Sequence, residues 1–539
     1  MVTMFNASEV RLSTAGMLKW NVINDTDWVS GKASLRDLGS PSISYLKLAL
    51  ALLVLYFTWE QAYFLATRRR KSGKMLPGPS FAVPLVGGVV QMVLDPYKFW
   101  EDQRKASFPG LSYNSILGKL MVFSTDVDVS RRMLSVNDES SLLMAVHPSA
   151  KSILGPNNLA FMHGPAHKAI RKSFLALFMR KALGTYVELQ DGVVRAHIAK
   201  WLAADEGREI EIRHVIRDMN AATSQHVFAG PYLDDGAERE KFSAAFMDMT
   251  QGFLAFPLCL PGTQVWRGKQ GRLFILGVLR KAAACSKAAM QAGVEPRCLM
   301  DFWALRCLEE VAEADAAGEA PPRHTSDEAM ADTVMDFLFA SQDASTASLV
   351  WLTAILAERP DILQKVREEQ AQLRPDPAAT ITGDVLNQMT YSRQVVKEVL
   401  RYRPPAPMVP QITQAEFPLT EDYTAPKGAL LMPSLIAASM QGYRDAHEFD
   451  PDRFGPERKE DMTCAKYFLT FGFGPHYCVG REYATNHLIV YLAILATSCD
   501  WTRRRTEASA DDSQNWLYLP TIYPHDSLIT LHRRGSASA

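Results

Sequence analysis

Few cysteines and a nearly balanced charge set the first limits on this sequence. Its 539 residues include seven cysteines and carry a formal net charge of −1. No two cysteines form a CxxC pair, so a dense disulfide framework is not expected, and the folded part is predicted to lie in a reducing compartment. Because the sequence also lacks a basic field, a zinc finger and a basic helix with interleaved aromatic residues, nucleic acid is not an expected partner.

Internal repeats and long low-complexity tracts are also lacking, and the pattern that remains is mainly helical. Apolar residues make up 47% and charged residues 22% of the chain, which is a normal globular balance. The clearest helix is predicted from Ser326 to Glu358, with Thr325 and Glu328 as a capping box, and it is expected to be central because it is apolar on all sides. Short strands are expected near Leu120–Ser124, Ala429–Met432 and Ser527–Leu531, and an exposed loop at Ala312–Arg323.

The most apolar stretch, residues 43–66, predicts a transmembrane helix. Its charge-free core is shorter than the roughly 20 residues that a span prefers, but flanking charges can reach the interface. Arg68–Lys71 follow directly, and the positive-inside rule then places the rest of the chain in the cytoplasm. Residues 1–42, with glycosylation sequons at Asn6 and Asn24, would face the lumen. A buried helix of a soluble protein is the alternative.

The remainder divides into a linker, a domain and a tail. Residues 67–88 are basic and rich in proline and glycine, and prolines stiffen a linker, so we predict a semi-rigid hinge there. Residues 89–534 form the predicted folded domain. Residues 535–539 are predicted to be a disordered tail.

One cysteine has neighbours that suit a metal-binding loop. Residues 471–480 read Phe-Gly-Phe-Gly-Pro-His-Tyr-Cys-Val-Gly, and a helix is predicted from Arg481 to about Thr497. Glycine lets the backbone approach a flat ligand and adopt positive φ. The following helix N-terminus stabilises a thiolate at Cys478, and such a ligand donates electron density to a bound iron. A buried cysteine in a glycine-rich turn is the alternative.

The cysteine loop resembles the haem loop of cytochromes P-450. It matches FxxGxxxCxG at Phe471, Gly474, Cys478 and Gly480. Three further segments resemble motifs of this family, namely Glu398-Val-Leu-Arg401, Phe449-Asp-Pro-Asp-Arg453-Phe454 and His167-Lys-Ala-Ile-Arg171, in which His167 replaces the usual tryptophan. The resemblance implies a mainly α fold, with one large triangular helical domain and a small β region at residues 89–534 behind the transmembrane helix. It also implies haem b as prosthetic group, with Cys478 as the axial ligand of the iron.

The resemblance implies roles for the other motif residues. Haem contacts are expected from His167, Arg171, Phe471, Gly474, His476 and Gly480. Glu398, Arg401 and Arg453 are expected to form a buried ion network that supports the cysteine loop, in which a missing partner would leave costly unpaired charge. Taken singly, Glu398 and Arg401 would also suit a surface ion pair, and either histidine a structural role.

The predicted central helix departs from the family at one position. The segment Ala340-Ser-Gln-Asp-Ala-Ser-Thr346 keeps the acid, Asp343, but has Ala344 where the family usually has threonine. That hydroxyl helps to deliver a proton for O–O cleavage, so Ser345, or Gln342 with water, is expected to replace it. Some haem-thiolate enzymes without this threonine rearrange peroxides and use no O2. Peroxide chemistry therefore stays open, although the cysteine loop lacks the insertion that such relatives usually carry.

Within the family, parts of the chain resemble the sterol C-22 desaturases of fungi, plants and algae. These parts are Phe337–Thr346, His147–Lys151 with Leu154–Asn158, and Pro520–Asp526. The resemblance implies removal of two vicinal hydrogens from a sterol side chain, with O2 as co-substrate and electrons passing from NADPH through a flavoprotein reductase. It also implies a single-pass protein of the endoplasmic reticulum membrane. Positioning of the side chain is expected to decide desaturation over hydroxylation.

The substrate pocket is expected to be apolar and fed from the membrane. The apolar segment Phe253–Pro261 lies where the family has a loop that dips into the bilayer, although core packing would explain it equally well. Candidate pocket residues are Met144, Phe161, Leu338, Ala340, Met408, Val409, Thr521 and Ile522. Three other functions stay open: a hydroxylase of another lipid or terpenoid, a reductase-independent peroxide isomerase or dehydratase, and a membrane haem-binding protein without turnover.

Overall fold

The computed structural model describes residues 41–107, 110–233, 236–512, 516–518 and 521–535, with side chains from residue 45 onward. The predicted lumenal segment up to residue 40, its sequons at Asn6 and Asn24, and residues 536–539 of the predicted tail lie outside the described residues. The chain divides into two compact units, Met1–Trp59 and Glu60–Ala539.

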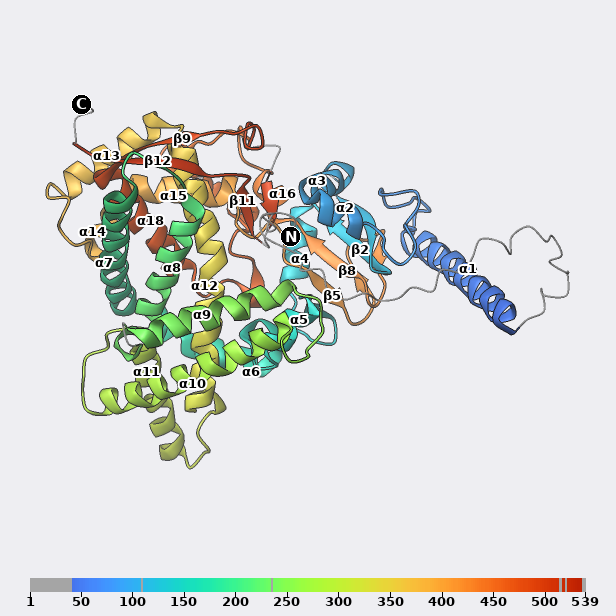
Figure 1. Cartoon of the computed structure of the whole chain (residues 1–539), viewed down its shortest axis with the longest axis horizontal. Coiled ribbons are helices and arrows are strands. Elements are labelled where there is room, and N and C mark those ends of the chain that lie inside the picture. Colours follow the sequence, from blue (N-terminus) through green and yellow to red (C-terminus); the bar gives the residue numbers. More distant parts are fainter. Residues whose placement is uncertain (1–40, 108–109, 234–235, 513–515, 519–520, 536–539) are drawn as a thin grey trace, which may run out of the picture. The chain divides into compact units, whose positions relative to one another are not determined.

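Helices dominate the described chain, and the strands are few and short (Figure 1). The helices are α1 Pro41–Thr67, α2 Val89–Leu94, α3 Pro96–Ser107, α4 Val127–Leu134, α5 Pro148–Leu154, α6 Gly164–Ser173, α7 Arg180–Asp205, α8 Ile212–Phe228, α9 Ala237–Gln251, α10 Gln264–Gln291, α11 Leu299–Ala317, α12 Asp327–Leu356, α13 Pro360–Leu373, α14 Gly383–Gln388, α15 Thr390–Tyr402, α16 Leu435–Ser439, α17 Glu460–Thr463 and α18 Arg481–Ser498. The strands are β1 Leu111–Ile116, β2 Lys119–Ser124, β3 Leu142–Met144, β4 Glu209–Glu211, β5 Gln411–Thr413, β6 Phe417–Pro418, β7 Thr424–Ala425, β8 Leu430–Pro433, β9 Cys499–Arg504, β10 Trp516–Tyr518, β11 Ile522–Pro524 and β12 Leu528–Arg533. The mainly α fold with a small β region is confirmed.

Helix α1 contains a segment with the length and composition of a membrane span. Within the described residues, Tyr45–Thr67 is the one such segment. Side chains along it, including Leu46, Leu52 and Leu55, are exposed. A buried soluble helix would hide these side chains, whereas a lipid-facing helix exposes them.

The residues that follow Trp59 belong to the second unit and pack within it. Glu60 is only 2% exposed. Arg68 donates hydrogen bonds to the Pro79 carbonyl at 3.1 Å and to the Tyr113 hydroxyl at 3.0 Å. Residues 67–88, which the sequence suggested as a hinge, are therefore held against β1 by specific contacts.

Several element boundaries differ from the sequence prediction. The N-cap of α12 is Ser326, whose hydroxyl accepts a hydrogen bond from the Ala329 N–H at 3.2 Å. The predicted capping box of Thr325 and Glu328 is wrong, because the Thr325 hydroxyl bonds instead to the Pro322 carbonyl. The predicted loop at 312–323 is also too long, since α11 continues to Ala317. The predicted strands correspond to β2, β8 and β12, and the predicted helix after the cysteine loop to α18.

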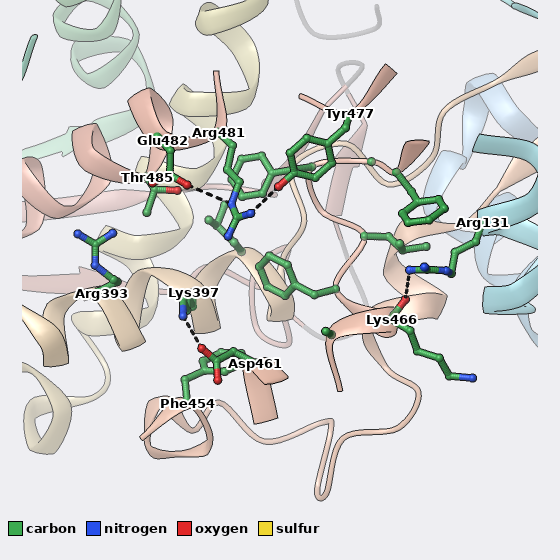
Figure 2. Close-up of a pocket in the computed structure, with 17 residues that line it drawn as sticks. Arg131, Arg393, Lys397, Phe454, Asp461, Lys466, Tyr477, Arg481, Glu482 and Thr485 are labelled. Carbon is green, nitrogen blue, oxygen red and sulfur yellow. Dashed lines mark hydrogen bonds and ion pairs between the residues drawn. The ribbon is translucent and has the colours of Figure 1, made fainter. Parts of the chain in front are cut away.

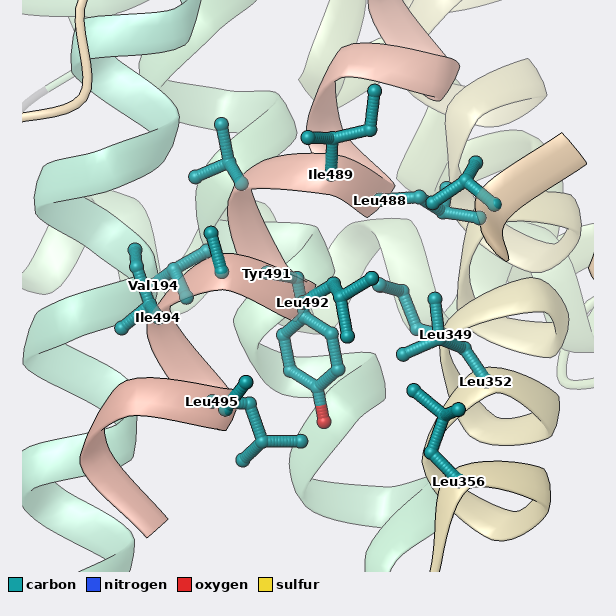
Figure 3. Packing of buried hydrophobic residues seen from close by; sticks show 14 of the residues in the cluster. Val194, Leu349, Leu352, Leu356, Leu488, Ile489, Tyr491, Leu492, Ile494 and Leu495 are labelled. Atoms are coloured by element: carbon teal, nitrogen blue, oxygen red, sulfur yellow. The ribbon is translucent and has the colours of Figure 1, made fainter. Parts of the chain in front are cut away.

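Helices α7 and α12 both pack against α18 in a large apolar core (Figure 3). Its members include Val194 of α7, Leu349, Leu352 and Leu356 of α12, and Leu488, Tyr491 and Leu495 of α18. Two buried indoles add directed bonds, because Trp351 donates to the Ile522 carbonyl and Trp501 to the Thr353 carbonyl, each at 3.0 Å. Because this core is closely packed, α12 and the start of α18 are held in a fixed position relative to each other.

The largest sheet in the described chain lies beside this helical core. Its strand order is β1-β2-β8-β5-β3, with β2 and β8 parallel and the other neighbours antiparallel. In the β3–β5 pair Met144 lies opposite Gln411. This pairing fixes the position of Met144 at the end of β3.

Candidate active site

A cavity of about 390 Å³ lies between α12 and the loop that carries Cys478. Four α12 residues at intervals of four line it: Asp336, Ala340, Ala344 and Ser348. Residues spaced in this way share one face of a helix. Aromatic walls close the cavity, with Phe178, Phe228, Phe337 and Phe339 among them. The cavity is thus largely apolar, and Cys478 lies across it from the small residues Ala340, Ala344 and Ser348 of α12.

Burial and the polar groups around Cys478 act on its thiol in opposite directions, and the net effect is a raised pKa. Its backbone N–H donates to the Phe471 carbonyl at 2.9 Å, which closes the loop on itself. Burial raises the pKa of the Cys478 thiol, whereas the Gly480 backbone N–H and the Arg171 guanidinium lower that pKa. Helix α18 begins at Arg481, so the sulfur also lies at a helix N-terminus, which favours the thiolate.

A cluster of nitrogen-bearing side chains forms one edge of the cavity. The rings of His167 and His476 stack with centroids 4.2 Å apart, and the ring of His163 lies 5.0 Å from that of His476. Burial lowers the pKa of His167 and of His476 to about 4, so both rings are neutral near pH 7. Nε2 of His476 has no hydrogen-bond partner within the described structure, and Arg171 donates to the Tyr477 carbonyl at 2.6 Å. This edge suits an acidic group of a ligand.

These groups fit iron protoporphyrin. Cys478 would supply a sulfur ligand, the apolar walls would suit the faces of the macrocycle, and His167, Arg171 and His476 would offer N–H donors to its carboxylates. Phe471 and Gly480 also line the cavity, as expected for haem contacts.

Gly474, an expected haem contact, lies against the end of α4 and is not among the cavity-lining residues. It has φ +73°, and a Cβ there would lie 2.6 Å from the Leu134 carbonyl oxygen. The glycine therefore allows the loop to approach the end of α4 and does not line the cavity. Gly472, also at φ +73°, lines the cavity together with Gly480.

Glu398, Arg401 and Arg453 form a buried ion network. All three side chains are fully buried, with Glu398 2.7 Å from Arg401 and 3.0 Å from Arg453. Arg453 also reaches Glu460 at 3.1 Å, so two carboxylates face two guanidinium groups. Backbone carbonyls accept the remaining arginine N–H groups, for example Ala446 from Arg401 at 2.8 Å. Balanced charge and complete hydrogen bonding are the conditions under which a buried network is tolerated.

The network is connected to the cysteine loop through α15. The Thr470 hydroxyl, just before the loop, donates to the Leu400 carbonyl at 2.8 Å. Leu400 lies between the two charged residues that α15 contributes, Glu398 and Arg401. Movement of the network would therefore move the start of the loop.

The predicted catalytic side chains of α12 do not all face the cavity. Ser345 and Ala344 line it. Gln342 instead donates to the Arg217 carbonyl on α8 at 3.1 Å, so its amide is directed away. Asp343 is not among the residues lining the cavity. Burial raises its pKa, and the charge of Arg217 lowers it.

Three of the eight candidate pocket residues line the cavity, namely Met144, Ala340 and Val409. The other five, Phe161, Leu338, Met408, Thr521 and Ile522, are not among its lining residues. Leu338 lies in the apolar core, and Met408 lines a separate pocket beside Trp100. Sequence reasoning missed Asn158, Phe228 and Asp336. Extending the four-residue spacing of Ala340 and Ala344 back by one turn would have found Asp336.

The segment Phe253–Pro261 exposes most of its apolar side chains. Phe256 is 80% and Leu254 60% exposed, whereas Phe253 is buried. Core packing therefore explains Phe253 alone, and the other apolar side chains form a surface patch.

A second pocket lies on the other side of the cysteine loop (Figure 2). Phe471, Gly472 and Tyr477 line both this pocket and the cavity. Its rim is mainly basic, with Arg131, Arg393, Lys397, Lys466 and Arg481 against Asp461 and Glu482. Several of these charges are engaged, since Lys397 pairs with Asp461 at 2.7 Å and Arg481 bonds to Tyr477 at 2.6 Å. The exposed loop face is thus positively charged overall.

The fold and the cysteine site together define a haem-thiolate protein, and comparisons agree. The family model described as Cytochrome P450 matches residues 77–523, and the chain belongs to this family. The solved structure of retinoic acid bound cyanobacterial CYP120A1 has a TM-score of 0.70 at 24% identity, over 85% of this chain and 99% of that one. The family implies haem iron, O2 and an electron donor.

Two relatives give a finer comparison. "Cytochrome P450 710A2" of Arabidopsis thaliana is 38% identical over 479 residues, which are 88% of this chain and 93% of the relative. "C-22 sterol desaturase ERG5A" of Gibberella zeae is 34% identical over 467 residues, which are 83% of this chain and 85% of the relative. Sterol C-22 desaturases are thus among the homologues.

Substitution of Glu398 by glutamine tests the supporting network. Both arginines would lose their shared carboxylate, and breaking a buried pair costs on the order of 3–5 kcal/mol. We expect a lower unfolding temperature and little haem retained per protein, measured by thermal unfolding and haem absorbance. The matched control, Asp102→Asn, removes an exposed pair with Lys98 at 2.9 Å and should cost less than about 1 kcal/mol. Equal losses in the two variants would contradict the supporting role.

Proposed function

We propose that the protein introduces a double bond at C-22 of a sterol side chain, using O2 and electrons from NADPH. The observation that carries the proposal is the elongated apolar cavity, which extends along α12 from the Cys478 loop and suits a rigid apolar substrate. The homologous C-22 sterol desaturases support the choice of reaction.

Haem bound at Cys478 would supply O2 activation and hydrogen abstraction. The protein's own contribution is to position the substrate and deliver a proton. Ala340 and Ala344 are small and leave room in the cavity for the sterol side chain, and a fixed pose would bring two vicinal hydrogens in turn to the reacting centre. Ser345 lines the cavity with a hydroxyl that can pass a proton directly or through water. Asp343, which is influenced by the charge of Arg217 and lies outside the cavity lining, is the acid that we infer to resupply the proton through water.

The electron donor we infer is a flavoprotein reductase that docks at the basic rim shown in Figure 2. Binding there would bring a donor close to the haem, because Phe471 and Tyr477 border both the rim and the cavity. Charge complementarity with an acidic partner would speed their encounter. The anchor Tyr45–Thr67 would hold the protein in the endoplasmic reticulum membrane, with the domain cytoplasmic.

A turnover assay tests the reaction. Microsomal protein would receive reductase, NADPH and a sterol with a saturated side chain, and products would be analysed by mass spectrometry. We expect a product that is lighter by two hydrogens, with the new double bond in the side chain. A product heavier by one oxygen would replace this proposal with a hydroxylase, and turnover of a lipid peroxide without NADPH would replace it with a peroxide isomerase.

Charge reversal at Lys466 tests the docking surface. Its side chain is 47% exposed and lies 3.5 Å from Asp128. Lys466→Glu should lower the reductase-supported rate several-fold, and the deficit should shrink as salt screens the charges. Lys105→Glu is the matched control, since Lys105 is also exposed and lies 3.5 Å from a carboxylate, that of Glu101. Equal rates in the two variants, measured at equal haem content, would place the docking surface elsewhere.

A further inference from the structure

One carboxyl group lies in the wall of the otherwise largely apolar cavity. Asp336 is the acidic residue among the described lining residues, and it is 7% exposed. One carboxylate oxygen accepts a hydrogen bond from Asn158 Nδ2 at 2.5 Å, and the other from the Leu159 N–H at 2.9 Å. Burying a charged group is costly, so its presence in an apolar wall calls for an explanation.

The hydrogen bonds to Asp336 leave some acceptor sites of its carboxylate unused. A carboxylate offers about four acceptor sites, and the contacts from Asn158 and Leu159 occupy two. Asn158 lines the cavity as well, and its Oδ1 accepts from the Ala160 N–H at 3.0 Å. A ligand hydroxyl can therefore bond to Asp336 without displacing either contact.

The surrounding charges make this carboxyl versatile near neutral pH. Burial, first, and the neighbouring Asp332 raise its pKa to about 7, against the lowering effects of the Leu159 N–H, Asn158 and Arg272. Arg272 is itself paired with Asp332 at 2.6 Å. Near pH 7 the Asp336 carboxyl is thus present in two forms. The ionised form accepts a hydrogen bond from a ligand, and the protonated form can also donate one.

The place of Asp336 on α12 sets a distance from the reacting end of the cavity. It lies eight residues before Ala344 on the same lining stripe. The helical rise of about 1.5 Å per residue makes this separation roughly 12 Å. A sterol is a rigid ring system with a hydroxyl at one end and its side chain at the other, so one molecule can span the two positions.

We propose that Asp336, supported by Asn158, binds the 3-hydroxyl of the sterol and so determines which side-chain carbon reaches the Cys478 end of the cavity. This inference rests on the proposed function and deepens it. Asp336 acts here as a specificity-determining residue. The hydroxyl fixes one end of the substrate, and the rigid rings carry that constraint to the side chain.

Ligand-binding spectra test the inference without relying on turnover. The haem-containing protein would be titrated with a 3-hydroxysterol and with its 3-deoxy analogue, and the shift of the haem absorbance would give the two dissociation constants. We expect wild type to prefer the hydroxysterol by roughly tenfold or more, because a site built for a hydroxyl is left unpaired without it. Asp336→Leu should bring the ratio close to one.

Two further variants separate recognition from support of the cavity wall. Asp332→Asn changes a neighbouring acid that is not among the lining residues, and it should keep a clear preference for the hydroxysterol. Asn158→Ala removes a hydrogen bond that holds the Asp336 carboxyl, and it should weaken the preference without abolishing it. Equal affinities of the wild type for the two steroids, or an unchanged affinity ratio in Asp336→Leu, would overturn the role assigned to Asp336. Either result would leave the proposed function intact. Loss of the preference in Asp332→Asn to the same extent as in Asp336→Leu would show that the cavity wall, and not the Asp336 carboxyl, determines the preference. If neither steroid bound to protein with a normal haem spectrum, the proposed function itself would fall.

Discussion

The structure depends on holding one sulfur atom at the floor of an apolar cavity. Cys478 lies in a glycine-containing loop that is closed by the hydrogen bond from the Cys478 N–H to the Phe471 carbonyl and is also held by its surroundings. On one side Thr470 bonds to Leu400 of α15, next to the fully buried pair Glu398 and Arg401. On the other side the loop continues into α18, which packs in the apolar core. Ionic and apolar parts of the protein thus meet at this loop.

The position of the Cys478 loop, between the cavity and the protein surface, explains how the two faces of the loop differ. The inner face borders a cavity with aromatic walls, where a haem and an apolar substrate fit. The outer face is basic and exposed, where a charged partner fits. Phe471 and Tyr477 border both faces of the loop, so under the proposed function electrons would arrive from one side while the substrate is held on the other.

Sequence reasoning succeeded where a function needs residues close together in the chain. The cysteine loop, the Glu398–Arg401 pair and the long α12 helix are local patterns, and each was found. It failed where tertiary packing decides. Leu338 and Ala340 are two residues apart on α12, but one faces the core and the other the cavity. Gly474 looked like a haem contact, yet its backbone is shaped by the end of α4, which lies far away in sequence. Asp336 went unnoticed because it belongs to no motif, and only the folded structure shows which of the acids on α12 faces the cavity.

The carbon-monoxide spectrum of the reduced protein tests the central claim most directly. Thiolate ligation by Cys478 predicts the long-wavelength Soret band that is typical of this class in the wild type. In Cys478→His that band should be lost and replaced by the shorter-wavelength band of imidazole-ligated haem. A wild-type protein that binds haem without the long-wavelength band, or a Cys478→His variant that keeps it, would contradict the account.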